Sequence, residues 1–173
     1  MKKLLVLFLL SGLALTASAQ KYGHLNFGNL LSLMPETKAA DEALKKFQDE
    51  MVAKGDTMAK KFQQKYVAAA KEVQEGKLSP LQQQQLEESL KKEQETIVSY
   101  QQEVNQKVQA KREELLTPII DKAEKAIADV AKTNGYVMVF DTSVFNAILF
   151  AQDADDMMPL LKTKLGIKEE PKK

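Results

Sequence analysis

The middle of the chain contains two long segments in which apolar residues recur at helical spacing. In the first segment the apolar positions follow steps of three and four, and nine steps cover 33 residues, a mean of 3.67. That mean belongs to an eleven-residue repeat, which forms a straight or slightly right-handed stripe along an α-helix. The stripe is narrow, so we expect a helix that is solvated on most sides. It comprises Ala40, Leu44, Phe47, Met51, Gly55, Met58, Phe62, Tyr66, Ala69 and Val73.

The second segment repeats this pattern and predicts a longer helix that ends near Thr133, where Asn134-Gly135 supplies a cap. Pro118 falls inside the helix and is expected to kink it or to mark the junction between two parts of the protein. The stripe is interrupted by Glu93, Gln101 and Arg112. Its apolar members are Leu86, Leu90, Ile97, Val104, Val108, Leu115, Ile119, Ala123, Ala126 and Val130.

A sharp break separates the two helices. Gly76 is placed to end the first one in a left-handed conformation. Ser79, Pro80 and Gln82 then form an N-cap, a first helical residue and a capping box. Because the connection is short, the helices should be antiparallel neighbours. At 1.5 Å per residue they would be roughly 60 Å and 80 Å long, so the hairpin is expected to project beyond the rest of the protein.

The flanking segments carry strand patterns. Residues 21–27 alternate until Gly28 and are followed by a helical turn that ends at Met34, before Pro35. The run "GYVMVFD" predicts a strand buried on both faces, and "NAILF" predicts another. Asp153 or Asp155 is expected to cap a last helix that ends at Gly166. Three short strands and two small helices make a thin core, which oligomerisation would complete.

The first nineteen residues combine Lys2 and Lys3, a short apolar run and Ala17-Ser18-Ala19. This pattern predicts a cleaved secretory signal peptide, the alternative being a membrane anchor. Cleavage would change the formal charge from +1 to −1, since it removes two of 25 basic residues and none of 24 acidic ones. A chain near neutrality has no global field to attract nucleic acid.

The composition restricts catalysis and metal binding. The chain has no cysteine and one histidine, His24, which excludes thiolate chemistry and disfavours imidazole metal sites. Asp141, Asp153, Asp155 and Asp156 miss the spacing of a calcium loop. No phosphate-binding G-x-x-x-x-G-K-[ST] motif and no nucleophile elbow occurs. We therefore predict no enzyme, cofactor or metal, with a small hydrolase as the rejected alternative.

The order of these elements resembles the Skp/OmpH family of periplasmic chaperones. The specific segments are the opening "KYGHLNFGNLLSLMPE" and the closing "NGYVMVFDTSVFNAILFAQDADDMMPLLKTKLG", whereas the hairpin has a composition common to many coiled coils. The resemblance implies an α+β homotrimer with a small barrel-like β-body and one protruding helical hairpin per subunit. It also implies ATP-independent binding of unfolded outer-membrane β-barrel proteins in the periplasm.

On this basis we divide the chain into residues 1–19 (signal peptide), 20–35 with 118–167 (trimerisation body), 36–117 (hairpin arm with its tip near 76–80) and 168–173 (solvated tail). The predicted body and trimer-interface residues are Leu25, Phe27, Val137, Val139, Phe140, Ile148 and Leu149. The client-binding candidates are Met51, Met58, Phe62, Tyr66, Val73, Leu90, Ile97 and Val104.

Two alternatives stay open. Most of the stripe can simply be the seam between the two arm helices, which leaves client contact chiefly to Met51, Phe62 and Tyr66. The whole protein can also be an envelope coiled-coil spacer or adaptor without chaperone activity. Contact with envelope lipid is expected to be weak, because the lysines between Lys54 and Lys71 face glutamates between Glu87 and Glu95. We therefore do not predict a lipopolysaccharide site.

Overall fold

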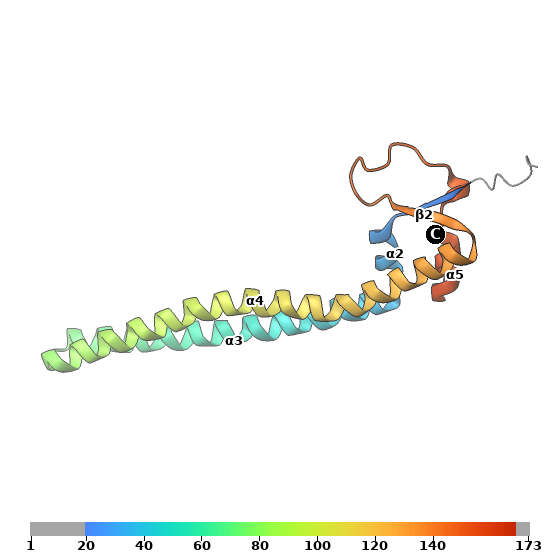
Figure 1. Cartoon of the computed structure of the whole chain (residues 1–173). Coiled ribbons are helices and arrows are strands. Elements are labelled where there is room, and N and C mark those ends of the chain that lie inside the picture. Colours follow the sequence, from blue (N-terminus) through green and yellow to red (C-terminus); the bar gives the residue numbers. More distant parts are fainter. Residues whose placement is uncertain (1–19, 169–173) are drawn as a thin grey trace, which may run out of the picture. The chain divides into compact units, whose positions relative to one another are not determined.

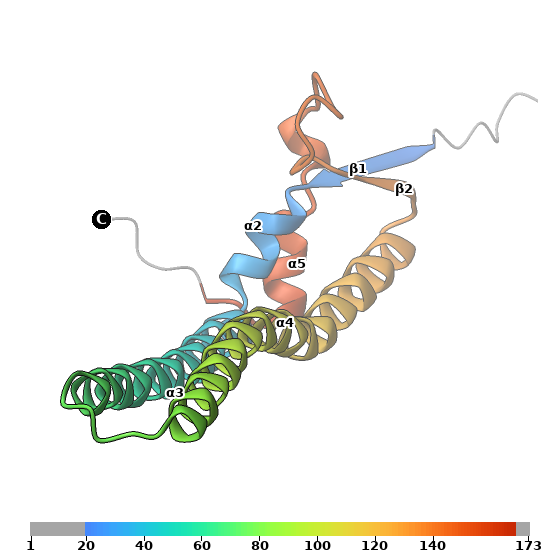
Figure 2. The same ribbon diagram turned by 90° about the vertical axis from the view of Figure 1, so that its left-hand side faces the viewer.

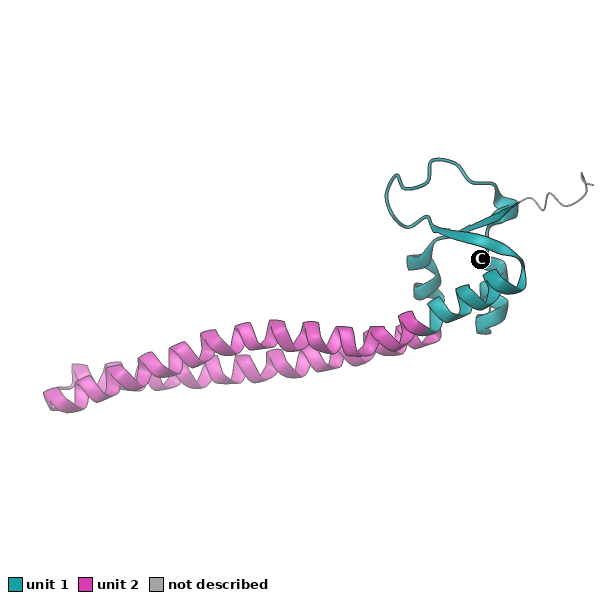
Figure 3. Ribbon diagram, in the orientation of Figure 1, with its two compact units in different colours: residues 1–33, 122–173 teal, residues 34–121 magenta. Residues whose placement is uncertain are grey.

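The computed structural model describes residues 20–168 and divides into two compact units. The first unit combines residues 1–33 and 122–173, and the second comprises residues 34–121 (Figure 3). The predicted signal peptide lies outside the described residues, as does the predicted tail beyond Lys168.

The second unit is the predicted antiparallel hairpin. Its helices are α3 (Pro35–Gln74) and α4 (Pro80–Thr133), which run side by side in Figures 1 and 2. Gly76 adopts the left-handed conformation with φ 62°. The Ser79 N–H donates to Gln82 Oε1 at 2.8 Å and the Gln82 N–H lies 3.4 Å from Ser79 Oγ, which is the predicted capping box. The break and both helices are thus confirmed.

Helix α4 continues through Pro118 without interruption and enters the first unit at Lys122. It ends at Thr133, and Gly135 follows with φ 71°, which confirms the predicted left-handed cap.

The first unit contains a parallel pair of strands, β1 (Lys21–Leu25) and β2 (Tyr136–Asp141), with Gly23 opposite Val139. On its other edge β1 bonds to the chain near Asp156, because the Met157 N–H donates to the His24 carbonyl at 2.9 Å. Among residues 20–168, no strand pairs with the outer edge of β2. The remaining elements are the helices α2 (Phe27–Leu33) and α5 (Met158–Leu165) and the 3₁₀ turn η2 (Asp153–Asp155).

The core of this unit is small and closely packed. Gly23 is required because a Cβ there would lie 2.6 Å from Met157 Sδ. Helices α2 and α5 contact each other (Figure 2), and Lys164 on α5 forms an ion pair with Asp129 on α4 at 3.1 Å. The buried apolar residues are Leu25, Leu30, Ala123, Ala126, Val130, Met157 and Leu161.

The predicted third strand is wrong. Residues 146–150, "NAILF", form an irregular segment in which Asn146 has a positive φ of 59°. A strand needs a neighbour to satisfy its backbone groups, and none of the described residues pairs with this segment. Phe145, just before this segment, is 91% exposed, and Leu149 and Phe150 within it are 90% and 82% exposed.

Two further predictions about the first unit are corrected. Strand β2 forms as expected, but Val137, Met138 and Phe140 are exposed rather than buried on both faces, because the chain supplies only one partner strand. The last helix has Met157 as its N-cap residue, without a side-chain hydrogen bond at the cap, so neither Asp153 nor Asp155 caps it. The Asp156 carboxylate accepts from the Met158 N–H at 2.9 Å, and the other two aspartates lie in η2. The helix does end at Gly166, with φ 67°.

Asp141 joins β2 to the start of α2. Its Oδ1 accepts from the N–H groups of Phe27 at 3.0 Å and Ser143 at 2.8 Å, and its Oδ2 accepts from Ser143 Oγ at 2.7 Å. Burial alone would raise the pKa of Asp141, but the hydrogen bonds from Ser143 and Phe27 outweigh it and hold the pKa below its ordinary value. The charged carboxylate therefore stabilises the folded unit.

We expect Asp141→Asn to lower the free energy of unfolding at pH 7 by about 1.5–3 kcal/mol, the range for hydrogen bonds to a charged group. Because the folded-state pKa is depressed, the contribution of Asp141 is present above the unfolded pKa and is lost as the pH falls through the folded pKa. The difference between wild type and variant should therefore shrink below about pH 4. Urea unfolding followed across pH 2.5–7 measures it, and a constant difference would contradict the assignment.

Candidate functional site

The seam of the hairpin is built from half-buried positions on α3 and α4 spaced by three and four residues. On α3 these positions include Met51, Gly55, Met58, Phe62 and Lys65, and Ala69 is buried. On α4 they include Leu86, Leu90, Glu93, Ile97 and Val104, and Tyr100 is buried. Two of these positions, Lys65 and Tyr100, were not expected from the sequence.

Tyr100 inserts into a gap left by a glycine. A Cβ on Gly55 would lie 3.4 Å from the Tyr100 ring, and the Tyr100 hydroxyl donates to the Met51 carbonyl at 3.0 Å. The Lys54 ammonium lies 5.2 Å from the ring centroid. The signal in the sequence was Gly55 itself, since a glycine within an otherwise apolar stripe leaves room for a large side chain from the opposite helix.

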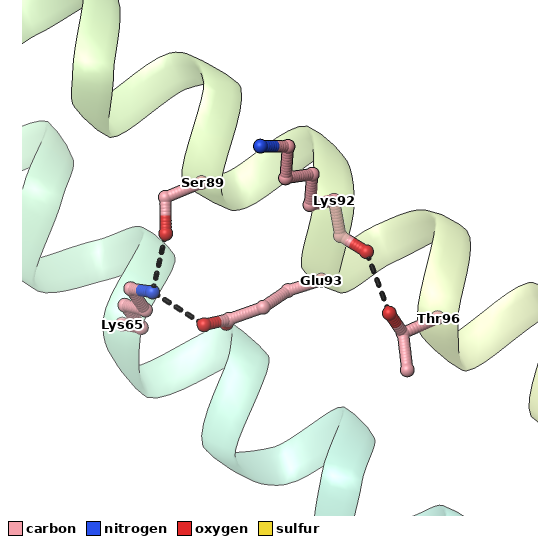
Figure 4. Close-up of polar contacts among 5 residues, drawn as sticks. All are labelled: Lys65, Ser89, Lys92, Glu93 and Thr96. Atoms are coloured by element: carbon pink, nitrogen blue, oxygen red, sulfur yellow. Dashed lines mark hydrogen bonds and ion pairs between the residues drawn. The ribbon is translucent and has the colours of Figure 1, made fainter.

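A polar contact crosses the seam nearer the tip. Lys65 Nζ donates to Ser89 Oγ at 2.9 Å and pairs with the Glu93 carboxylate (Figure 4). The side chains of Lys65 and Glu93 are 39% and 44% exposed, so this pair contributes modestly to stability. Its larger consequence is geometric, because Lys65 occupies the seam position that the sequence pattern gave to Tyr66. Tyr66 is displaced to the side of the seam and is 57% exposed.

The structure therefore separates the client-binding candidates into two groups. Tyr66 and Val73 are exposed beside the seam. The other six candidates lie half-buried along it: Met51, Met58, Phe62, Leu90, Ile97 and Val104.

The body candidates also differ in exposure. Leu25 is already buried within the chain, whereas Phe27, Val139 and Ile148 are half-buried. Val137, Phe140 and Leu149 are exposed.

An open, mainly apolar cavity of about 570 Å³ lies within the first unit. It is lined by Tyr22, His24, Phe140, Ile148, Leu149 and Phe150, among others. His24 Nε2 forms a hydrogen bond with the Gln152 carbonyl at 2.9 Å, which ties β1 to the end of the irregular segment. The cavity and the exposed apolar segment beside it give this unit an incompletely covered surface.

Among residues 20–168, none of the helices combines the length and the hydropathy of a membrane span. The same residues contain no group of three or more His, Asp or Glu side chains that could hold a metal ion.

We expect Tyr100→Ala to destabilise the hairpin by about 3–5 kcal/mol, as for other buried aromatic truncations, because it empties the space over Gly55. Tyr100→Phe keeps the ring but removes the bond to the Met51 carbonyl, and should cost only about 1 kcal/mol. Urea unfolding followed by far-UV circular dichroism measures both variants. Equal, small losses would show that the ring does not pack as described.

Taken together, the elements define a two-unit α+β protein whose second unit is an antiparallel helical hairpin with a partly polar seam. A family model described as "Outer membrane protein (OmpH-like)" matches residues 21–165. The chain belongs to this OmpH-like family. The match confirms the resemblance drawn from the opening and closing segments.

The fold is also similar to a solved structure from Caulobacter crescentus CB15, that of a candidate outer membrane chaperone (OmpH-like). The two chains share 15% sequence identity with a TM-score of 0.72, over 86% of this chain and 85% of the other. At this identity the similarity concerns the fold. No curated protein matches the sequence.

Proposed function

We propose that this chain is an ATP-independent holdase chaperone that binds unfolded outer-membrane β-barrel proteins in the periplasm and prevents their aggregation. The observation that carries the proposal is the family match over residues 21–165. The chaperone name of the solved structure with the same fold supports it. The predicted signal peptide supports delivery to the periplasm.

The physical chemistry of the hairpin suits this task. An unfolded β-barrel strand exposes alternate apolar side chains and unpaired backbone groups, which aggregate in water. A holdase without fuel must bind many such segments weakly and release them, so contacts spread along a surface serve better than one tight pocket. The hairpin offers Met51, Met58 and Phe62 at half-buried positions, and methionine adapts its shape to irregular apolar partners.

The proposal includes a homotrimer assembled through the first unit. Three observations support self-association: the outer edge of β2 lacks a partner among the described residues, Val137 and Phe140 are exposed on that strand, and Leu149 is 90% exposed beside the open cavity. Exposed apolar surface of this kind marks an interaction site. Phe27, Val139 and Ile148, which are half-buried, would extend the interface, and Leu25 would support it from within the chain.

The proposal is tested by diluting a urea-denatured β-barrel outer-membrane protein into buffer with and without the purified chain and following light scattering. We expect scattering to be suppressed at one trimer per client, with no effect of added ATP. Unchanged scattering at that ratio would overturn the chaperone function. A spacer or adaptor would give that unchanged result while keeping its native helix content.

A further inference from the structure

The two flanks of the hairpin seam differ in character. Between Met51 and Ala69 the seam positions on α3 alternate steps of four and three, so residues seven apart lie at the same place relative to α4. One residue C-terminal to the seam residues Met51, Met58 and Lys65 lie Val52, Ala59 and Tyr66, respectively. Val73 lies seven residues after Tyr66. We call these four residues, Val52, Ala59, Tyr66 and Val73, the flank strip. All four are exposed.

The opposite flank of α3 carries two lysines, Lys54 and Lys61. Lys54 lies near the Tyr100 ring and acts on Glu103, whose pKa is lowered mainly by its bond to Lys107 and to a lesser degree by Lys54. Lys61 follows Lys54 at seven residues and lies on the same flank. Because that flank of α3 lies beside Glu103, the flank strip lies beside the other side of α4.

That other side of α4 mixes amide, apolar and charged side chains. In an antiparallel pair it carries Gln94, Gln101 and the exposed Val98, and nearer the tip Glu87 and Lys91. On α3 the next row outward from the flank strip consists of Asp56, Gln63 and Ala70. The two rows of α3 that border the seam therefore differ: the flank strip is wholly uncharged, whereas the opposite row carries Lys54 and Lys61.

We propose that the flank strip is the surface of the hairpin that contacts the unfolded client, and that it takes uncharged apolar segments of extended polypeptide. This inference rests on the proposed function and assigns one face of the hairpin to it. An apolar client segment bound to the uncharged strip does not remove charged side chains from water. Binding to the opposite flank would bury charged side chains, which costs much free energy.

The size of the strip favours a client segment over a second hairpin. The exposed fractions are 46% for Val52, 57% for Tyr66 and 45% for Val73, and 54% for Val98, which lies on α4 beside the strip. Covering these side chains would bury on the order of 400 Å², about half of the roughly 800 Å² per partner in a stable interface. The strip is therefore suited to short-lived contacts rather than to permanent pairing.

Tyr66 is the central residue of the strip. Its ring lies 6.3 Å from the ring of Phe62, which is half-buried in the seam, and the two rings are tilted by 37°. Phe62 therefore packs against the Tyr66 ring and restricts its motion. Because the Tyr66 side chain is already restricted, it loses less conformational entropy when a client binds. The polar pair of Lys65 and Glu93 keeps Tyr66 out of the seam.

The test compares two double variants of the full-length chain. Tyr66→Gln/Val73→Gln removes apolar side chains from the strip. Val67→Gln/Leu81→Gln removes apolar side chains that are more exposed, 61% and 64%, but point outward from their helices and lie off the strip. Both are assayed with a urea-denatured β-barrel outer-membrane protein, and far-UV circular dichroism verifies their helix content.

We expect the strip variant to need at least about fivefold more chaperone for half-maximal suppression of scattering, and the control variant less than twofold more. Equal effects of the two variants would overturn the assignment of this face. If the wild type itself does not suppress scattering, the proposed function fails instead. Sedimentation velocity should show the same association state for both variants. A change confined to the strip variant would mean that a second copy covers the strip, which also overturns the proposal.

Discussion

Replacing residues 45–112 by a short linker is expected to abolish the suppression of client aggregation while leaving the first unit folded and associated. The deletion removes the flank strip and most of the seam, and with them every client-binding candidate, from Met51 to Val104. The core of the first unit does not depend on the deleted segment for its buried residues, since Leu25, Leu30, Met157 and Leu161 all lie outside it.

The deletion is checked by light scattering with a denatured β-barrel client and by sedimentation velocity on the same sample. We expect scattering to match that of client alone and the deletion variant to sediment as the wild-type oligomer of a shorter chain. The double variant Val67→Gln/Leu81→Gln provides a control with an intact hairpin. Retained suppression by the shortened chain would place client binding on the first unit, and loss of association would show that the hairpin contributes to assembly.

The hairpin could be predicted from the sequence because its signals are local. Gly76, Ser79 and Gln82 determine where one helix ends and the next begins, and the residues that form these caps are within a few positions of one another. Good helix formers fill the rest, so no distant contact is needed to decide the secondary structure. The same holds for Gly135 and Gly166, which end α4 and α5.

The details of the seam could be predicted only in part, because they depend on the opposite helix. A periodic pattern identifies a stripe on each helix but not which side chain of one meets which of the other. The sequence placed the lysines between Lys54 and Lys71 opposite the glutamates between Glu87 and Glu95, and Lys65 does pair with Glu93. The pattern did not reveal that this pair lies in the seam itself, with Ser89 as a further partner of Lys65. The sequence pattern did not place Tyr100 in the seam, because its ring fills a space that exists only where Gly55 has no side chain.

The first unit was predicted least well, since its fold depends on contacts between segments far apart in the chain. The apolar run of β2 correctly predicted a strand, but an apolar run does not reveal which chain will cover it. The same ambiguity made "NAILF" resemble a strand. Within one chain this segment is irregular, and its apolar side chains remain exposed.

That exposure leads to the second large expected effect. Substituting Phe145, Leu149 and Phe150 together by serine should convert the proposed trimer into monomers. Full burial of a large apolar side chain contributes about 1.5–3 kcal/mol, so three per subunit amount to several kcal/mol of association free energy. These side chains are 82–91% exposed within the chain, so their loss should not unfold it. Exposed apolar surface of this size is costly in a solitary soluble chain, and burial against other copies would remove that cost.

Sedimentation velocity at micromolar concentration, with circular dichroism on the same samples, measures the association state and the fold of this triple variant. Val67→Ser, which removes an exposed apolar side chain from α3, is the matched control and should leave association unchanged. A triple variant that still forms the wild-type oligomer would contradict a role for the irregular segment in the interface. A wild type that sediments as a monomer would contradict the assembly itself, and the apolar surface of the first unit would then need a different partner.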